Sequence, residues 1–256
     1  MADSKEKRMA ILIDADNVSS QYIKTILHEA SSFGTVNVKR IYGDWTKPNL
    51  KSWTEVLLPN SIRQMQQPNY TSGKNSTDSG MIIDAMDLFY SGSLDGFCLV
   101  SSDSDFTSLA MRLKESGMFI VGMGMKTTPN PMVAACNSFK FLDVINPEVS
   151  VKNTINSKNE AVIKVSVKAN SKSNEVKELI TTIKEIIDLN SNDDGWIMLS
   201  ALQPVLIKIK PEFDTRNYGF KKMLPLIESL NSFEIKNEIT NLQNPDAHII
   251  FIKNIN

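Results

Sequence analysis

The amino-acid sequence predicts a parallel α/β domain followed by a small winged helix-turn-helix domain. Up to about Pro147, strand-like apolar runs alternate with helix-like runs, a pattern typical of a parallel sheet covered by helices on both faces. Beyond about Asn174, apolar residues at helical spacing precede two β-type runs, which indicates short helices closed by a hairpin. A chain of 256 residues is long enough for both domains.

The first domain, residues 1–147, contains five strand-like runs and four helix-like runs. The strands are expected at residues 9–13, 36–42, 61–66, 97–101 and 118–123. The helices are expected at Ser19–Phe33, Pro48–Leu57, Thr77–Tyr90 and Asp105–Ser116. Ser76 or Thr77 can cap the third helix, which puts Asp78 in its first turn, where the helix dipole favours negative charge.

The residues after the first domain change in composition. Residues 148–173 are rich in Asn, Ser, Lys and Val without a helical stripe, so we expect a polar linker with one edge strand at Ala161–Val167. In the second domain, residues 174–256, Glu175–Leu189 predicts an amphipathic helix. Strands are expected at Phe233–Asn237 and His248–Lys253.

Composition excludes several classes of protein. The net charge of −1 gives no general attraction to nucleic acid, although a bound metal can supply local positive charge to a nuclease. Two histidines argue against a His-rich zinc site, and two cysteines in apolar surroundings predict buried thiols in a reducing cytoplasm. The apolar runs are too short to span a membrane, and the amino terminus lacks the features of a secretory signal.

Acidic residues stand at the ends of the predicted elements. Asp14, Asp44 and Asp103 follow strands, and Asp78 opens a helix. Ligands of parallel sheets bind beyond the carboxyl ends of the strands, where grouped carboxylates repel one another unless a hard cation lies between them. We therefore predict a Mg²⁺ or Mn²⁺ site at Asp14, Asp78 and Asp103, assisted by Asp105. Each motif alone fits an ordinary cap or turn.

Other polar residues are weaker candidates. Asp16, Asn17, Asp44 and Asp84 are auxiliary candidates; Asn17 could orient Asp14 or a phosphate, and Asp84 is either half-exposed or supports the metal ligands. Lys74 precedes Asp78 by four residues in a Gly/Ser/Thr loop and is the best phosphate-binding candidate of the first domain.

Four segments carry a family resemblance: "ILIDADNV", "RIYGDW", "GKNSTDSGMIIDAMDLFY" and "CLVSSDSDFTSLAMRLKESG". Over roughly Ala10–Val144 they resemble the NYN domain, a branch of the PIN-like nucleases. The resemblance implies a three-layer α/β fold and a metal-dependent ribonuclease. It maps the family's acidic positions onto Asp14, Asp78, Asp103 and Asp105.

The second domain resembles the LOTUS domain, also called OST-HTH, through Gly195–Trp196, "LSAL" and "FDTRNYGFKKMLPLIESL". This resemblance implies RNA binding or docking of a protein partner. Arg216, Tyr218, Lys221 and Lys222 would then open a recognition-type helix, with Arg216, Lys221 and Lys222 as nucleic-acid contacts.

Three hypotheses follow for the whole chain. The first is an endoribonuclease that uses Mg²⁺ or Mn²⁺ and acts on single-stranded or structured RNA. The second is an RNA-binding adaptor without catalytic activity, and the third is a small-molecule phosphohydrolase, which the D-x-D spacing of Asp14 and Asp16 would fit. A homodimer is left open.

Overall fold

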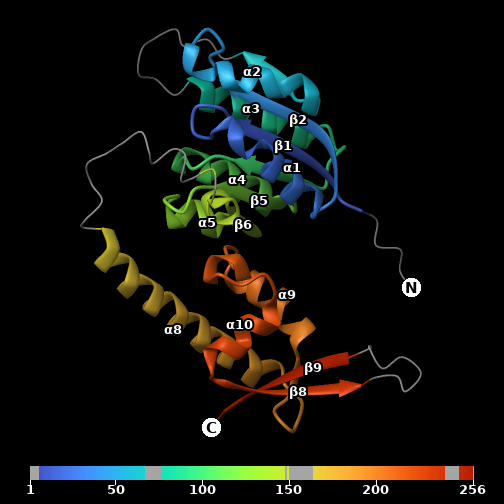
Figure 1. Cartoon of the computed structure of the whole chain (residues 1–256). Helices are drawn as coiled ribbons and strands as arrows, with labels where there is room; N and C mark the ends of the chain where they lie inside the picture. Colours follow the sequence, from blue (N-terminus) through green and yellow to red (C-terminus); the bar gives the residue numbers. More distant parts are fainter. Residues whose placement is uncertain (1–5, 67–75, 148, 150–163, 240–247, 256) are drawn as a thin grey trace. The chain divides into compact units, whose positions relative to one another are not determined.

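The computed structural model describes residues 6–66, 76–147, 149, 164–239 and 248–255, and it leaves out the side chains of residues 76–78, 164–173 and 239. The chain divides into two compact units, Met1–Val151 and Lys152–Asn256 (Figure 1). Each unit has its own hydrophobic core.

A six-stranded parallel sheet forms the centre of the first unit, with the order β3-β2-β1-β4-β5-β6. The strands are β1 (Arg8–Asp14), β2 (Thr35–Gly43), β3 (Arg63–Gln66), β4 (Gly96–Val100), β5 (Phe119–Gly124) and β6 (Ser138–Phe141). The first five were predicted. Strand β6 was not, because its four residues are too short to show a periodic pattern.

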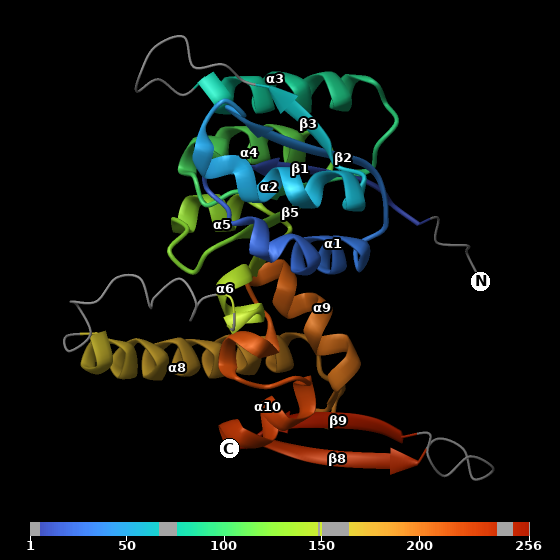
Figure 2. The same cartoon turned by 45° about the horizontal axis from the view of Figure 1, so that its top comes forward.

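Two apolar layers cover the two faces of this sheet, and the alternation along each strand explains them. In β1, Met9, Ile11 and Ile13 enter the core on one face, and Ala10 and Leu12 enter the core on the other. Helices α1 (Ile23–Ser31) and α2 (Lys51–Leu57) pack on the first face. The second face carries α3 (Ser76–Tyr90), α4 (Thr107–Glu115) and α5 (Asn130–Ala135) (Figure 2). The predicted three-layer α/β fold is confirmed.

Short 3₁₀ turns lead into three helices: η1 (Ser20–Tyr22) into α1, η2 (Pro48–Leu50) into α2 and η4 (Ser104–Phe106) into α4. A further turn, η3 (Leu58–Asn60), follows α2, and the short helix α6 (Leu142–Ile145) follows β6. Helices α5 and α6 were not predicted, since six and four residues show little helical periodicity.

The strand order creates a switch point between β1 and β4. From β1 the chain proceeds through β2 to β3 on one side, and from β4 it proceeds through β5 to β6 on the other. Open α/β sheets bind ligands beyond the carboxyl ends of the strands at such a point. Asp14 ends β1, and the segment Ser101–Asp105 follows β4, so both flank the switch point.

The second unit combines helices with a three-stranded antiparallel sheet of order β7-β9-β8. Its elements are α8 (Lys164–Asn190), β7 (Ile197–Met198), α9 (Leu199–Ile209), η5 (Thr215–Tyr218), α10 (Met223–Leu230), β8 (Phe233–Ile239) and β9 (His248–Asn254). The β8–β9 hairpin corresponds to the predicted wing.

Helix α8 corrects the predicted linker. It begins at Lys164, inside the range 148–173 that we expected to be a polar linker, and its first residues include part of the edge strand expected at Ala161–Val167. Residues 150–163 lie outside the described part of the chain. The apolar stripe of α8 begins only near Val176, which explains why the sequence pattern did not extend the helix backwards. None of the helices that the structure describes is long and apolar enough to cross a membrane.

Candidate active site

Asp14 is the most buried acidic residue at the switch point, with 1 % of its surface exposed. Its Oδ1 accepts a hydrogen bond from the backbone N–H of Asp16 at 3.1 Å. Its Oδ2 accepts from Nδ2 of Asn17 at 2.6 Å and from Oγ of Ser101 at 2.8 Å. Asn17 thus contacts Asp14, one of the two groups that it was predicted to orient.

Ser101 joins the ends of β1 and β4. While its hydroxyl donates to Asp14, the same oxygen accepts the backbone N–H of Asp103 at 3.0 Å. Asp103 in turn caps η4, since its Oδ1 accepts the backbone N–H of Asp105 at 2.9 Å. Our sequence reasoning did not single out Ser101, although its place directly after a fully buried strand was a signal.

Strand alternation explains why these groups meet. In β1, Ala10 and Leu12 face the layer that contains α3 and α4, and Asp14 continues this alternation. Phe97 and Leu99 of β4 face the same layer, and Ser101 continues theirs. Both side chains therefore lie on the face where α3 and η4 contact each other.

Burial raises the pKa of Asp14 above that of an ordinary carboxyl group. The hydrogen bonds from Asn17, Ser101 and Asp16 favour the charged form and oppose this shift, and the nearby charge of Asp16 adds to it. Within the residues that the structure describes, no Lys or Arg forms an ion pair with Asp14. Its charge is therefore buried without a cationic partner in the described part of the chain.

The other predicted metal ligands have different environments. Asp103 is half-buried and Asp105 is exposed. Asp78 lies in the first turn of α3, as predicted, but its side chain is outside the described part, as is all of Lys74. Among the side chains that the structure describes, no three His, Cys, Asp or Glu residues come close enough together to hold a metal ion.

Asp44 and Asp16 stabilise the loop that follows β2. Oδ1 of Asp44 accepts hydrogen bonds from Oγ1 of Thr46 at 2.6 Å and from Nε2 of Gln66 at 3.3 Å. The bond from Thr46 is the main reason why the pKa of Asp44 is lowered. Asp16 lies 4.0 Å from Nζ of Lys47. Both auxiliary candidates therefore have local partners in this loop.

Asp84 of α3 belongs to a separate group of three residues that it forms with two residues of the sheet. Its carboxylate accepts hydrogen bonds from the guanidinium of Arg40 and the hydroxyl of Tyr42, both on β2. Burial and the contact with Asp84 raise the pKa of Tyr42. Of the two roles considered for Asp84, the structure shows a half-buried residue that ties α3 to β2.

Comparison with known proteins identifies the first unit. The model of the NYN domain matches residues 8–143. The chain belongs to the NYN-domain family. The OST-HTH/LOTUS domain model matches residues 171–243, so both predicted resemblances are confirmed. The chain thus pairs a nuclease-type NYN domain with an RNA-binding module.

Individual relatives match mainly one half of the chain. An uncharacterized protein of Methanocaldococcus jannaschii is 27 % identical over 124 residues, which are 46 % of this chain and 48 % of that protein. The chain thus spans about half the length of this curated relative. A solved structure of a protein of unknown function from Vibrio parahaemolyticus is 20 % identical, with a TM-score of 0.46, and the match covers 54 % of this chain and 94 % of that one.

In the OST-HTH/LOTUS domain, the predicted nucleic-acid contacts precede α10 rather than open it. Arg216 lies in η5, where its guanidinium binds the carboxylate of Asp214 at 2.7 and 2.8 Å. Lys221 lies in the following loop, and Lys222 is the residue before α10. Gly219 explains the shift, because its positive φ of 88° ends η5 before α10 begins.

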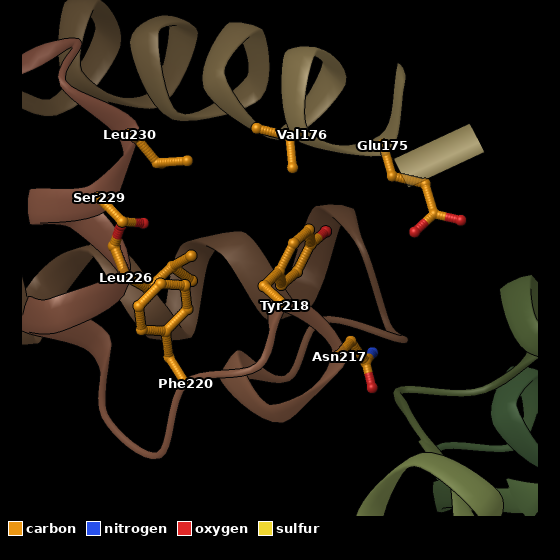
Figure 3. A pocket seen from close by; sticks show the side chains of 8 residues that line it. All are labelled: Glu175, Val176, Asn217, Tyr218, Phe220, Leu226, Ser229 and Leu230. Atoms are coloured by element: carbon orange, nitrogen blue, oxygen red, sulfur yellow. The ribbon is translucent and has the colours of Figure 1, made fainter. Parts of the chain in front are cut away.

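A pocket of about 220 Å³ lies between the first described side chains of α8 and the segment from η5 to α10 (Figure 3). Tyr218, Phe220 and Leu226 form apolar walls, with Val176 opposite them on α8. Burial and the charges of neighbouring glutamates raise the pKa of Tyr218 to about 12. The NYN domain site, by contrast, is built from hydroxyl, amide and carboxylate groups.

Proposed function

We propose that the chain is a Mg²⁺- or Mn²⁺-dependent ribonuclease that hydrolyses phosphodiester bonds in RNA. One observation carries the proposal: the buried carboxylate of Asp14 has no cationic partner among the described residues and is linked through Ser101 to Asp103 at the switch point. The pairing of a nuclease-type domain with an RNA-binding module supports RNA as the substrate.

The chemistry of the donor set fits a hard divalent cation. Asp14 and Asp103 offer carboxylate oxygens, the ligands that Mg²⁺ and Mn²⁺ prefer. A cation would also compensate the buried charge of Asp14, which three hydrogen bonds but no Lys or Arg in the described structure stabilise. Asp14, Asp78 and Asp103 would hold the cation with help from Asp105, and it would supply positive charge against the phosphate and make a bound water more acidic.

The residues around the carboxylates have positioning roles. Asn17 and Ser101 both donate to Oδ2 of Asp14, which fixes the plane of the carboxylate and leaves Oδ1 with a single backbone donor. The cap at η4 fixes Asp103 through its Oδ1, and within the described residues its Oδ2 accepts no hydrogen bond. Each carboxylate thus keeps oxygen lone pairs that can face a ligand in a defined direction.

Asp103→Asn tests the proposal. We expect cleavage of a labelled single-stranded RNA to fall by more than the 10- to 100-fold that loss of a supporting residue costs, because the substitution removes one ligand charge. Ser101→Ala, which removes only a supporting hydroxyl, should lose about 10- to 100-fold. Cleavage rates over a Mg²⁺ and Mn²⁺ titration, with EDTA as the blank, measure both effects.

Asp87→Asn is the matched control, because Asp87 is an exposed carboxylate on α3 in the same unit. Circular dichroism should show that all three variants remain folded. If Asp103→Asn cuts RNA as fast as the native chain at saturating Mg²⁺, the site is wrong. RNA binding without any metal-dependent cleavage would instead establish the adaptor hypothesis.

A further inference from the structure

The small sheet of the second unit has an inner and an outer face that differ in character. Ile197 of β7, Ile252 of β9 and Phe233 of β8 are buried in the core of this unit. Because side chains alternate along a strand, their neighbours Met198, Phe251 and Lys253 point to the opposite face. The register places Met198 beside Phe251, and Phe251 beside Lys236.

This outer face combines apolar residues with charges of both signs, since Glu234 and Glu238 of β8 lie on it together with the two lysines. We define it by six residues: Trp196, Met198, Lys236, Ile249, Phe251 and Lys253. The four apolar members are not part of the hydrophobic core clusters, and 44 % of Met198 is exposed. Trp196, Ile249 and Phe251 are half-buried, so part of this apolar surface reaches solvent.

Trp196 is the centre of the outer face. It directly precedes β7, and its ring is half-buried. Nζ of Lys236 on β8 and Nζ of Lys253 on β9 each lie 5.9 Å from the centroid of the ring, within the range of a cation–π contact. Two ammonium groups from different strands thus lie at one indole.

Gly195 allows Lys253 to come this close. Its φ of +80° is a left-handed conformation, and a β-carbon at this position would lie 3.3 Å from Cε of Lys253. A larger residue would therefore strain the backbone and crowd the lysine at the edge of the indole.

We propose that the outer face binds single-stranded RNA, with a base stacked on Trp196 and the adjacent phosphates at Lys236 and Lys253. Non-specific single-strand recognition needs this combination of an aromatic ring for the base and cations for the backbone. Phe251, two residues before Lys253 on β9 and on the same face, offers a second ring for the next base. The inference deepens the proposed function, since it assigns the RNA surface of the second unit.

Two acidic residues lie on the same face, and the register places Glu234 opposite Lys253. Glu238 binds Lys236 at 2.5 Å, and both side chains are about half exposed. Exposed ion pairs of this kind contribute little, so a phosphate can replace the glutamate at small cost. Lys253 has no such pair among the described residues.

Fluorescence anisotropy of a labelled single-stranded RNA, titrated with the full chain in EDTA so that no RNA is cut, tests the assignment. Trp196→Ala should weaken binding by about 5- to 100-fold, the loss of one stacked base, and Trp196→Phe by less. The double variant Lys236→Ala/Lys253→Ala should lower the slope of log Kd against log salt by about 1.4, the value for two lost phosphate contacts on a single strand.

Lys221→Ala/Lys222→Ala is the competing variant, because it removes the same charge from the segment before α10, where the family resemblance implies nucleic-acid contacts. If this variant weakens binding and the Trp196 variants bind as the native chain does, the proposal is overturned. A thermal unfolding temperature within a few degrees of that of the native chain shows that Trp196→Ala is folded. Trp196→Phe, which keeps an aromatic ring, tests stacking in a second variant.

The same preparations separate this proposal from the nuclease proposal. If Trp196→Ala loses RNA affinity but the native chain cuts no RNA with Mg²⁺ or Mn²⁺, the outer face stands and the nuclease proposal fails. If the native chain cuts RNA and Trp196→Ala binds it normally, the outer face is wrong and the nuclease proposal stands.

Discussion

At the scale of single residues, the burial of Asp14 makes a contribution of known sign to how the stability of the protein depends on pH. Its pKa is raised because burial disfavours the charged carboxylate. The folded chain therefore binds the proton of the Asp14 carboxyl group more tightly than the unfolded chain does. The resulting stabilisation is complete below the ordinary carboxyl pKa and is lost as the pH rises through the raised value.

We accordingly predict that Asp14→Asn changes how the stability of the metal-free protein depends on pH. The amide has no charge to bury, so the variant should gain stability relative to the native chain as the pH rises. Its amide nitrogen cannot accept the hydrogen bonds that a carboxylate oxygen accepts, which lowers the stability of the variant at every pH. Urea unfolding in EDTA between pH 3.5 and 8 measures the difference between the two chains.

Mg²⁺ should stabilise the native chain more than the variant. The native chain should gain stability with the logarithm of the free Mg²⁺ concentration, and Asp14→Asn should gain much less. A difference in stability that stays constant from pH 3.5 to 8 in EDTA would contradict the view that the buried charge of Asp14 has no cationic partner.

The sequence predicted that Asp14 and Asp103 lie at the carboxyl ends of strands, because each closely follows a strongly apolar strand, but it did not predict the strand order that makes this edge a switch point. It did not predict Ser101 as the link, since a serine in a Ser/Asp segment is equally typical of a turn. The partners of Asp84 were also beyond sequence reasoning. Arg40 and Tyr42 are more than 40 residues away, and only the crossing of α3 over β2 brings them near.

At the scale of elements, the Arg40–Tyr42–Asp84 group fixes α3 on the sheet. The side chains of Arg40 and Asp84 are only 19 % and 18 % exposed, so removing one leaves the other half-buried without its main partner. We predict that Asp84→Ala destabilises the first unit by about 2 kcal/mol, less than the loss for a fully buried pair because water still reaches these groups.

A double-mutant cycle with Arg40→Ala measures the coupling between the two residues by urea unfolding. Asp87→Ala, an exposed change on the same helix, is the control and should stay within about 0.5 kcal/mol of the native chain. Additive losses in the cycle would show that the pair does not hold α3.

Element boundaries were predicted best where apolar periodicity is strong. The strands β1, β2, β4 and β5 lie within one or two residues of their expected ranges. The start of α8 was missed because its first turns contain Lys, Ser and Asn without an apolar stripe. The family resemblance placed the segment before α10 at the start of a helix, whereas Gly219 ends η5 with a positive φ before α10 begins.

At the scale of the whole molecule, the two units have separate cores. The two apolar layers of the sheet lie within the first unit, and the third core cluster lies within the second. Stability that comes from apolar burial is therefore supplied within each unit. The net charge of −1, averaged over both, conceals the local pairing of Lys236 and Lys253 at one aromatic ring.

We predict that residues Met1–Val151 and Lys152–Asn256, produced separately, each fold and unfold cooperatively, because each contains its complete core. Calorimetry of each fragment should show an unfolding temperature within a few degrees of one of the two transitions of the full chain. Residues Met1–Val151 should retain metal-dependent cleavage of a short RNA at saturating concentration, since Asp14, Asp78, Asp103 and Asp105 all lie within them.

The comparison of the two fragments also locates RNA affinity. With the outer face at Trp196 removed, the first fragment should need about 5- to 100-fold more RNA to reach half its maximal cleavage rate, while the maximal rate stays close to that of the full chain. A lost maximal rate with unchanged affinity would instead mean that the second unit contributes to the active site. In that case the NYN site would be incomplete on its own, and the Asp103→Asn test would have to be made on the full chain alone.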